Sequence, residues 1–284
     1  MKNDMRFYKY QALGNDYLVL DGASADDLTA PLIVRICDRH FGLGSDGILL
    51  PSPASRPEDF GLRIFNPDGS EAEKSGNGLR IFARYLWDRG LVRGEPFTVQ
   101  TVGGAVRCEV RENGKAIFVE MGRAIFDSQE VPIRGLRREV VREVVHVGGQ
   151  TLRFTGVSVG NPHCVVHADK ISRDLAEQLG PLLEQHELFP NRTNVQFVKV
   201  LDPHRIQIEI WERGAGYTLA SGTSSCAAAA ASVRLGLCQG NITVSMPGGV
   251  LEIEVGPSFE LTMLGPAKRI ADGELSRELL EEAS

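Results

Sequence analysis

Apolar residues along the chain fall into short runs separated by turn residues and into four longer stretches with helical spacing. Short apolar runs bounded by Gly, Pro, Asn or Asp predict strands, and Gly14-Asn15 between two such runs predicts a hairpin. Apolar positions three and four residues apart predict helices. The predicted helices are Leu28–Asp38, Leu79–Trp87, Asp174–Gln185 and Thr223–Leu235, and the predicted strands are Phe7–Tyr10, Tyr17–Leu20, Leu62–Phe65, Thr98–Thr101, Ala105–Val110, Ala116–Met121, Val157–Val159, Cys164–His167, Arg205–Trp211, Ile242–Ser245, Val250–Val255 and Glu260–Met263.

The strands that follow the second and the fourth predicted helices succeed one another through short turns, so each set predicts a meander. Meanders around a helix are typical of mixed or antiparallel sheets and predict an α+β fold. The charged segment Pro132–Val147 is the expected connector between two domains. We therefore expect an N-terminal half over residues 1–130 and a C-terminal half over residues 131–265.

The two halves share a sequence repeat at a constant spacing. Three pairs of segments stand 146 residues apart: Gly14-Asn15 with Gly160-Asn161, Asn66 with Glu212, and Ser75-Gly76 with Ser221-Gly222. Three matches at one spacing across half of the chain favour a duplicated, pseudo-symmetric architecture. The alternative is two unrelated α/β domains that share the same turn residues.

Composition narrows the functional classes. The 284 residues include 31 Lys and Arg against 37 Asp and Glu, a net charge of −6, which argues against a nucleic-acid binder. No apolar run of about 18 residues predicts a transmembrane helix, and the N-terminus lacks the apolar stretch of a signal peptide. The five cysteines form no Cys-x-x-Cys pair, so we expect neither a disulfide framework nor a zinc site, and we expect a cytoplasmic protein with reduced thiols.

Two serines in the repeat precede predicted helices. Ser75-Gly76-Asn77 and Ser221-Gly222-Thr223 stand where helix N-termini would present unpaired N–H groups and a partial positive charge to a carboxylate. For one such serine, simple N-capping is the better explanation. Two equivalent sites favour a cleft between the halves that holds a small acid between two similar groups.

Inversion of a stereocentre by proton transfer suits that symmetry, because it needs a base on one face of the carbon and an acid on the other. The helix ends would stabilise negative charge that spreads onto the substrate carboxylate, and no cofactor is required. Several polar residues near the repeats fit an amino-acid ligand, although each alone could be structural. These residues are the amides Asn15, Asn66, Asn161 and Asn194, the pair Glu212-Arg213 after an apolar strand, and His163.

Seven motifs together resemble the diaminopimelate epimerase family of cofactor-independent amino-acid racemases, nearly from end to end. They are Ala12-Leu13-Gly14-Asn15-Asp16-Tyr17, Phe41-Gly42-Leu43-Gly44-Ser45-Asp46-Gly47, Phe65-Asn66-Pro67-Asp68-Gly69-Ser70-Glu71-Ala72-Glu73, Ser75-Gly76-Asn77-Gly78-Leu79-Arg80, Gly160-Asn161-Pro162-His163-Cys164-Val165, Asn191-Arg192-Thr193-Asn194-Val195 and Trp211-Glu212-Arg213-Gly214-Ala215-Gly216. The resemblance implies two barrel-like, mostly antiparallel domains, each around a central helix, with residues 266–284 returning to the first.

The resemblance also implies a reaction, the interconversion of LL- and meso-diaminopimelate in lysine biosynthesis. It implies catalytic roles for positions 75 and 221, with support from His163 and Glu212. Substrate contacts are implied for Asn15, Asn66, Gly76, Asn77, Asn161, Asn194, Glu212, Arg213, Gly222 and Thr223. We expect a homodimer that binds a small amino acid, with no nucleic-acid or membrane partner.

The sequence departs from the family pattern at the chemistry, because Ser75 and Ser221 occupy the two positions where the family has cysteine. A thiol has an ordinary pKa near 8.5, which a helix N-terminus lowers, whereas a serine hydroxyl is far less acidic. The alternatives are a natural divergent member, which coordinated differences near both sites favour, a binder that has lost the chemistry, and a Cys-to-Ser variant made to trap substrate. A serine hydrolase is a distant further alternative, because neither serine lies in a Gly-x-Ser-x-Gly motif.

Overall fold

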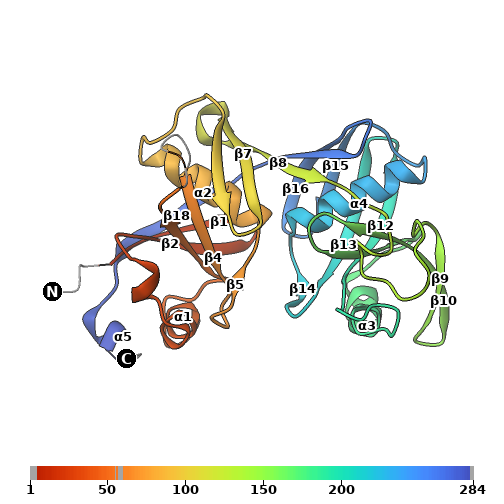
Figure 1. The fold of residues 1–284 in the computed structure, drawn as a ribbon, viewed down its shortest axis with the longest axis horizontal. Coiled ribbons are helices and arrows are strands. Elements are labelled where there is room, and N and C mark those ends of the chain that lie inside the picture. The colour runs from red at the N-terminus through yellow and green to blue at the C-terminus, as the bar shows by residue number, and fades with distance from the viewer. Residues whose placement is uncertain (1–4, 55, 57–59, 282–284) are drawn as a thin grey trace. The chain divides into compact units, whose positions relative to one another are not determined.

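The computed structural model describes residues 5–54, 56 and 60–281, which fold into two compact units (Figure 1). The first unit combines Met1–Val119 with Gly265–Ser284, and the second is Glu120–Leu264. Within the described part of the chain, no helix is both long and apolar enough to cross a membrane.

The first unit is a curled sheet around one central helix. Its elements are β1 (Arg6–Ala12), β2 (Asn15–Asp21), η1 (Ala25–Asp27), α1 (Ala30–Cys37), β3 (Ile48–Ser52), β4 (Phe60–Phe65), β5 (Glu71–Ala72), α2 (Gly76–Asp88), β6 (Phe97–Thr101), β7 (Gly104–Arg111), η2 (Glu112–Gly114), β8 (Ala116–Arg123), β18 (Lys268–Glu274) and α5 (Arg277–Glu281). Pairing is antiparallel for β1–β2, β3–β4, β6–β7 and β7–β8, and parallel for β2–β3 and β4–β6. The C-terminal strand β18 pairs antiparallel with β1, so the end of the chain belongs to this unit.

The hairpin between β1 and β2 explains how the first motif is shaped. Ala12 faces Asn15 in register, and Leu13 and Gly14 between them both have positive φ, 58° and 91°. Two such residues make the type I′ turn whose twist matches that of the flanking strands. The turn therefore places Asn15 at the start of β2, beside the central helix.

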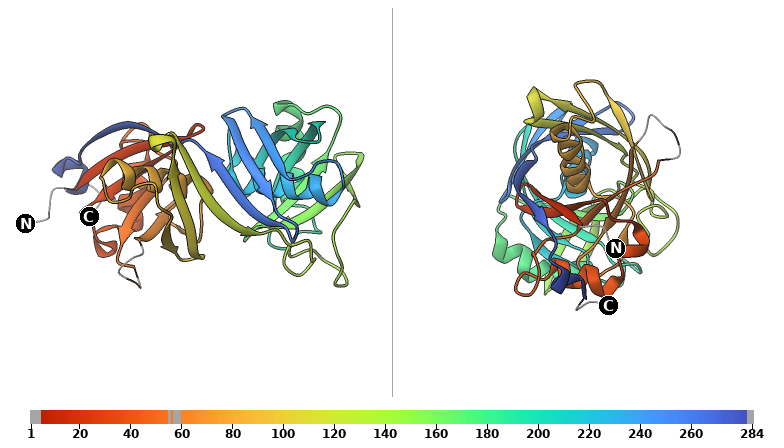
Figure 2. Two further views of the ribbon diagram at one scale, coloured as in Figure 1. Left: turned by 90° about the horizontal axis from the view of Figure 1, so that it is seen from above. Right: turned by 90° about the vertical axis from the view of Figure 1, so that its left-hand side faces the viewer.

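Helix α2 is buried on nearly all sides, as expected for a helix that a sheet surrounds (Figure 2). Leu79, Arg80 and Ile81 are consecutive and none has exposed surface, although consecutive residues point in different directions. An amphipathic helix on the surface of a sheet would leave one of them in water.

The second unit repeats the order and the pairing of the first. Its elements are β9 (Glu143–Val147), β10 (Gln150–Ser158), β11 (Pro162–His167), α3 (Arg173–Glu184), β12 (Asn194–Asp202), β13 (Arg205–Glu212), β14 (Gly216–Thr218), α4 (Gly222–Arg234), β15 (Asn241–Met246), β16 (Gly249–Val255) and β17 (Glu260–Gly265). Pairing is again antiparallel for β10–β11, β12–β13, β15–β16 and β16–β17, and parallel for β11–β12 and β13–β15. Helix α4 is completely buried from Ser224 to Ser232, where its small side chains let neighbouring strands approach closely.

The α+β class, the four predicted helices and the duplicated layout are confirmed. The interpretation of Pro132–Val147 as a charged connector is wrong. Ile133, Val140 and Val145 in this segment are buried in the core of the second unit, and its last residues form β9, which pairs with β10. The charged residues between these apolar positions lie on its outer side, so the segment is an edge of the unit and not a linker.

Candidate functional site

Both serines of the repeat cap the N-terminus of a central helix. Ser75 precedes α2 with φ −138° and ψ 119°, and Ser221 precedes α4 with φ −147° and ψ 127°. The Ser75 Oγ accepts a hydrogen bond from the Gly78 N–H at 3.0 Å, and the Ser221 Oγ accepts one from the Ser224 N–H at 3.4 Å. Each hydroxyl is therefore held in the same way at the positive end of a helix of 13 residues.

The first half-site gathers residues from β2 and α2. The Asn77 amide donates to Asn15 Oδ1 at 3.0 Å, and Arg80 donates to Asn77 Oδ1 at 2.7 Å. The hydroxyl of Tyr17 lies 3.3 Å from the Ser75 Oγ. The structure thus brings Asn15, Ser75 and Asn77 together around the start of α2.

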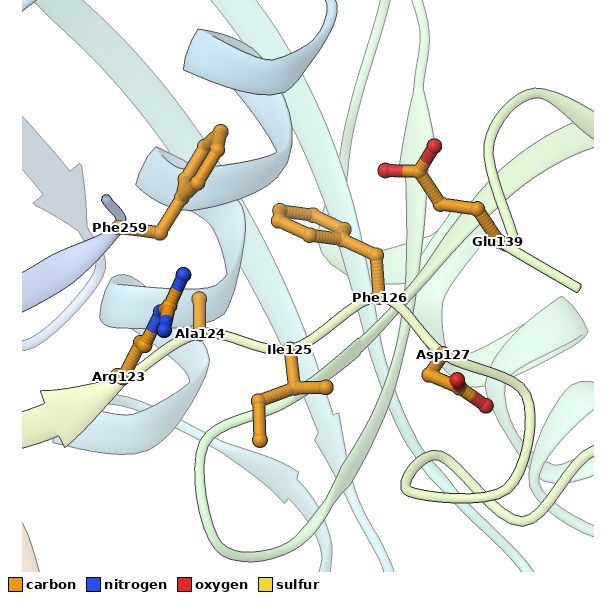
Figure 3. A pocket seen from close by; sticks show the side chains of 7 residues that line it. All are labelled: Arg123, Ala124, Ile125, Phe126, Asp127, Glu139 and Phe259. Atoms are coloured by element: carbon orange, nitrogen blue, oxygen red, sulfur yellow. The ribbon is translucent and has the colours of Figure 1, made fainter. Parts of the chain in front are cut away.

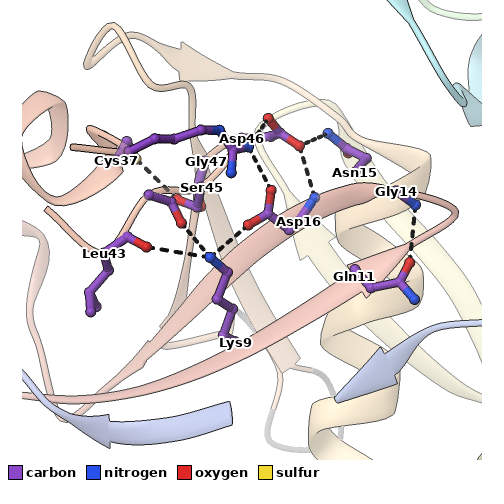
Figure 4. Close-up of polar contacts among 12 residues, drawn as sticks. Lys9, Gln11, Gly14, Asn15, Asp16, Cys37, Leu43, Ser45, Asp46 and Gly47 are labelled. Carbon is purple, nitrogen blue, oxygen red and sulfur yellow. Dashed lines mark hydrogen bonds and ion pairs between the residues drawn. The ribbon is translucent and has the colours of Figure 1, made fainter. Parts of the chain in front are cut away.

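A charged network holds Asn15 from its other side (Figure 4). The Asn15 amide and the Asp16 N–H both donate to Asp46 Oδ2, at 3.0 and 2.9 Å. Arg39 binds both carboxylates, at 2.8 Å to Asp16 and 2.7 Å to Asp46, and Lys9 lies 2.9 Å from Asp16. Asn15 is therefore fixed between the carboxylate of Asp46 and the helix residue Asn77.

The two carboxyl groups of this network have opposite pKa shifts. Burial and the charge of Asp16 raise the pKa of Asp46, although the Asp16 N–H donates to it. Burial alone would raise the pKa of Asp16 as well, but hydrogen bonds from Arg39 and Lys9 outweigh burial and lower it. Asp16 is thus the carboxylate that binds both Lys9 and Arg39, and Asp46 is the carboxylate that accepts a hydrogen bond from Asn15.

Asn66 lies in the turn that follows β4. Its amide donates to the Ser70 Oγ at 3.0 Å, and its backbone N–H donates to the Ser70 carbonyl at 2.8 Å. These bonds close the Asn66–Ser70 turn. Asn66 therefore has a structural role, which the sequence alone leaves open. Its implied contact with substrate stays a prediction.

The second half-site forms where β11 and β12 run side by side. His163 stands opposite Asn194 in this parallel pair. The Asn194 amide donates to the Pro162 carbonyl at 2.9 Å and its Oδ1 accepts from the Arg213 N–H at 3.0 Å. Asn194 therefore joins the strand that carries His163 to the segment that carries Arg213.

Other predicted site residues of the second unit lie at the end of β13 and at the start of α4. Glu212 ends β13 and is half-buried, and Arg213 is exposed with its guanidinium donating to the Asn191 carbonyl at 3.1 Å. Gly222 is the first residue of α4, and the Thr223 Oγ1 lies 3.4 Å from the Ser221 Oγ. The Thr223 hydroxyl is thus placed beside the hydroxyl for which we predicted a catalytic role.

His163 is fully buried and neutral at pH 7, because burial and, to a smaller extent, the charge of Arg213 lower its pKa to about 3, although a hydrogen bond with Gln196 opposes this shift. Its Nε2 lies 2.8 Å from Asn161 Oδ1, which can only accept, so Nε2 carries the ring proton. The ring Nδ1 and Gln196 Oε1 are both buried without a partner, while the Gln196 amide donates to the Ser224 Oγ at 3.0 Å. Gln196 lies within hydrogen-bonding reach of the ring. If its amide group is turned by 180°, the Gln196 amide N–H donates to His163 Nδ1 and Gln196 Oε1 accepts from the Ser224 hydroxyl.

The buried histidines predict a loss of stability in acid. In the folded chain the pKa is about 3 for His163 and about 4 for His167, both lowered by burial from the ordinary value of 6.5. Below pH 6.5 the unfolded chain binds protons that the folded chain does not, so stability falls as the pH falls towards these values. We expect a loss of roughly 1.4 kcal/mol per pH unit for each histidine between about pH 6 and 4. Urea unfolding at a series of pH values measures this slope.

A His163→Gln variant provides the check on that slope. It should be less stable at pH 7 but should lose less stability between pH 6 and 4 than the parent. His40→Gln is the matched control, because His40 is exposed. If His163→Gln leaves the slope as steep as the control does, His163 is not the buried group that titrates.

Several residues that touch the half-sites were not predicted as site residues, and Arg80, which donates to Asn77, is one of them. Tyr17 contacts Ser75, Asp46 holds Asn15, and Gln196 lies between His163 and Ser224. A signal for Tyr17 was present in the sequence, since it stands 146 residues before His163, at the spacing of the repeat. The contacts of Asp46 and Gln196 join strands and loops whose pairing the sequence pattern does not specify.

A cavity of about 530 Å³ lies elsewhere, in the second unit (Figure 3). Its lining consists of Arg123, Ala124, Ile125, Phe126, Asp127, Glu139 and Phe259, and includes none of the predicted site residues. Its carboxylates are already paired, Asp127 with Arg137 at 2.7 Å and Glu139 with Arg234 at 2.6 Å. It therefore offers no free acid–base pair. Among the residues described, no cluster of three or more His, Cys, Asp or Glu could hold a metal ion.

Comparison with known proteins agrees with this arrangement. A family model described as diaminopimelate epimerase matches residues 7–126 and 155–270. Diaminopimelate epimerase 2 of Nostoc sp. is 54% identical over 279 residues, which cover 97% of each chain. Diaminopimelate epimerase of Desulforudis audaxviator is 43% identical over 283 residues, 96% of this chain and 100% of that protein. A solved hydroxyproline epimerase from Agrobacterium vitis has the same fold, with a TM-score of 0.74 and 13% identity over 97% of this chain and 93% of that chain.

Proposed function

Because the chain belongs to the diaminopimelate epimerase family, we propose that it interconverts LL- and meso-diaminopimelate by proton transfer at the α-carbon, an isomerase reaction of lysine biosynthesis. The observation that carries the proposal is the pair of N-cap hydroxyls, Ser75 and Ser221, held in the same way at the start of two central helices. The reaction needs two proton-transferring groups of this kind, one for each face of the carbon.

Inversion at the α-carbon requires one proton-transferring group on each face of that carbon. One of the two serine hydroxyls takes part in removing the α-proton, and the other delivers a proton to the opposite face. The negative charge that develops spreads onto the substrate carboxylate, where N–H groups of the helix N-termini stabilise it. No step of this proton transfer needs a cofactor.

The polar residues of the half-sites position the substrate in this proposal. Amides supply donors and acceptors for its ammonium and carboxylate groups, the carboxylate of Glu212 faces an ammonium, and the guanidinium of Arg213 binds a carboxylate. The proposed contacts are Asn15, Asn66, Gly76, Asn77, Asn161, Asn194, Glu212, Arg213, Gly222 and Thr223, with His163 and Glu212 supporting proton transfer.

Exchange of the α-proton with solvent tests the proposal. The chain is incubated with LL- and with meso-diaminopimelate in heavy water, and deuterium at the α-carbon is measured by mass spectrometry. We expect uptake that a Ser75→Ala, Ser221→Ala double variant lacks. Uptake no greater than in that control would reject epimerisation of this substrate.

Calorimetry separates epimerisation from the alternative of a binder without chemistry. Affinity for diaminopimelate without exchange would identify a chain that retains the pocket and has lost the reaction. A panel of other amino acids in the same titration tests the substrate class. Absence of binding to every member of the panel would reject the ligand site itself.

The setting of the enzyme is part of the proposal. We infer a cytoplasmic homodimer that binds a small amino acid and no nucleic acid or membrane. The five cysteines are all buried and none is part of a disulfide, which suits a reducing compartment. Sedimentation equilibrium measures the oligomeric state, and a mass equal to 31.0 kDa in solution would exclude the dimer.

A further inference from the structure

Tyr17 contacts the reacting atom of the first half-site. It lies in β2, only 7% of its surface is exposed, and its hydroxyl is 3.3 Å from the Ser75 Oγ. The same Oγ accepts the Gly78 N–H at 3.0 Å. The serine oxygen therefore has two hydrogen-bonding neighbours, one from the helix N-terminus and one from the phenol.

The backbone of Gly47 makes room for this phenol. A Cβ at position 47 would lie 2.6 Å from the Tyr17 Cε1 and 2.5 Å from the Phe65 carbonyl oxygen, closer than side chains approach. Gly47 also has φ +156°, at the edge of the region that favours glycine. The ring of Tyr17 is thus seated against backbone that only glycine leaves open, which fixes its hydroxyl beside Ser75.

The repeat gives Tyr17 a counterpart. His163 stands 146 residues later, and both residues come two positions after an asparagine of the repeat, Asn15 and Asn161. Each half therefore places a ring that can exchange a proton in the second strand of an equivalent hairpin, β1–β2 in the first unit and β10–β11 in the second. In the second half this is the histidine for which we propose catalytic support.

Serine needs help that cysteine would not. A thiolate is accessible near neutral pH, whereas the far less acidic serine hydroxyl gives an alkoxide only where donors stabilise the negative oxygen. Hydrogen bonds donated to a charged form favour that form. Tyr17 and Gly78 together can supply two such donors to Ser75, in the manner of an oxyanion hole.

We propose that Tyr17 donates a hydrogen bond to the Ser75 Oγ and takes up the negative charge that a serine alkoxide would carry, so that Tyr17 and Ser75 act as one acid–base unit. When Ser75 protonates the substrate carbanion, its Oγ–H bond breaks and the Cα–H bond forms, while Oγ takes the proton of the more acidic Tyr17 hydroxyl, so the negative charge ends on the phenolate oxygen. In the opposite direction the phenolate takes the Oγ–H proton back while Oγ removes the α-proton. This inference rests on the proposed epimerase function.

Tyr17→Phe tests the unit directly, because it removes one oxygen and keeps the ring. We expect kcat for α-proton exchange to fall by about 10²–10³, the usual effect of losing one oxyanion donor, with KM changed less than about twofold. Tyr10→Phe is the matched control. Tyr10 faces Tyr17 across β1 and β2 and is fully buried, but its hydroxyl donates to Asp88 at 2.9 Å. Tyr17→Phe with the activity of the Tyr10→Phe control would overturn the proposal.

Repeating Tyr17→Phe in a Ser75→Cys background shows whether Tyr17 stabilises the charge of the serine or only supports the fold. In Ser75→Cys the thiolate needs less help, so adding Tyr17→Phe should cost less than about tenfold in kcat. An equal loss in the serine and cysteine backgrounds would contradict the proposal, because it would show that the phenol only supports the fold of the half-site.

A readout that does not require catalysis keeps this inference separate from the proposed function. The thiol introduced by Ser75→Cys is alkylated with iodoacetamide across a pH range, and its adduct is identified by mass spectrometry. Adding Tyr17→Phe should raise the pKa of this thiol by about 0.5–1, because a donor to the thiolate is lost. A parent without exchange activity rejects the proposed function only, whereas identical alkylation profiles reject the role of Tyr17.

Discussion

Ser75→Cys together with Ser221→Cys should raise epimerase activity by about 10²–10⁴, whereas either change alone should give much less. Both serines accept a backbone N–H at the start of a helix, Ser75 from Gly78 and Ser221 from Ser224, so thiolates at these positions would keep these bonds and gain from the helix dipole. Inversion needs a base and an acid in the same turnover, one per face. A single thiolate can remove the proton but leaves a poor donor opposite.

The four Ser and Cys combinations are compared side by side, by circular dichroism or chiral chromatography of a diaminopimelate stereoisomer. A single variant should support exchange of the α-proton better than net inversion, so the two changes should be strongly non-additive. Ser172→Cys is the matched control, because Ser172 caps α3 through the Leu175 N–H at 3.1 Å and belongs to neither half-site. A double variant that folds and binds but stays as slow as the parent would show that these positions are not the two proton-transferring groups.

Cys226 does not replace the missing thiols. It lies five residues after Ser221, inside α4, and has no exposed surface. A fully buried thiol meets no substrate, and a thiolate would be costly in such surroundings. Any activity of the parent therefore depends on the serines and on groups such as Tyr17 that surround them.

The sequence predicts the helices and the meanders because their hydrophobic patterns are local. Helical spacing of apolar residues identifies α2, a run of small helix-forming residues identifies α4, and the repeat identifies the serines that cap them. Short turns with glycine identify the strands after each helix. For these elements the local preference and the tertiary packing agree, which is the condition under which pattern reasoning succeeds.

The connector was misinterpreted and several strands, β3 and β12 among them, were missed, each for a different reason. In Pro132–Val147 six of the sixteen residues are charged, but Val140, Val145 and Val147 are buried while the residues beside them are partly or fully exposed. In β3 the residues Ile48–Leu50 are buried on both sides, so they show no alternation that marks a strand. In β12 the polar residue Gln196 is completely buried, which breaks the apolar pattern from within.

The contacts of the candidate site depend on tertiary structure. Tyr17 and Ser75 are 58 residues apart, and the Asp46 carboxylate reaches Asn15 across 31 residues. The residue types could be singled out from turns, caps and the repeat, but their partners follow from the parallel pairing of β2 with β3 and from the position of α2 inside the sheet. That pairing is long-range, and neither spacing nor charge along the chain determines it.

Arg80→Met should lower the free energy of unfolding of the first unit by about 2–4 kcal/mol and should weaken substrate binding. Arg80 has no exposed surface, and its guanidinium donates to Asn77 Oδ1 at 2.7 Å and to the Pro266 carbonyl at 3.4 Å. Methionine has a similar length but no donor, so it would remove both of these hydrogen bonds. Asn77 would then be free to turn away from Asn15, which its amide now contacts at 3.0 Å.

The two tryptophans allow the units to be followed separately, because Trp87 lies in α2 of the first unit and Trp211 in β13 of the second. Urea unfolding is measured by the fluorescence of Trp87 in a Trp211→Phe background, and of Trp211 in a Trp87→Phe background. Arg93→Met is the control, since Arg93 is exposed and its loss should change stability by less than about 0.5 kcal/mol. We expect Arg80→Met to shift the Trp87 transition to lower urea and the Trp211 transition much less. Equal shifts of both transitions would mean that the units unfold as one, and no shift of either would mean that Arg80 does not hold Asn77 in place.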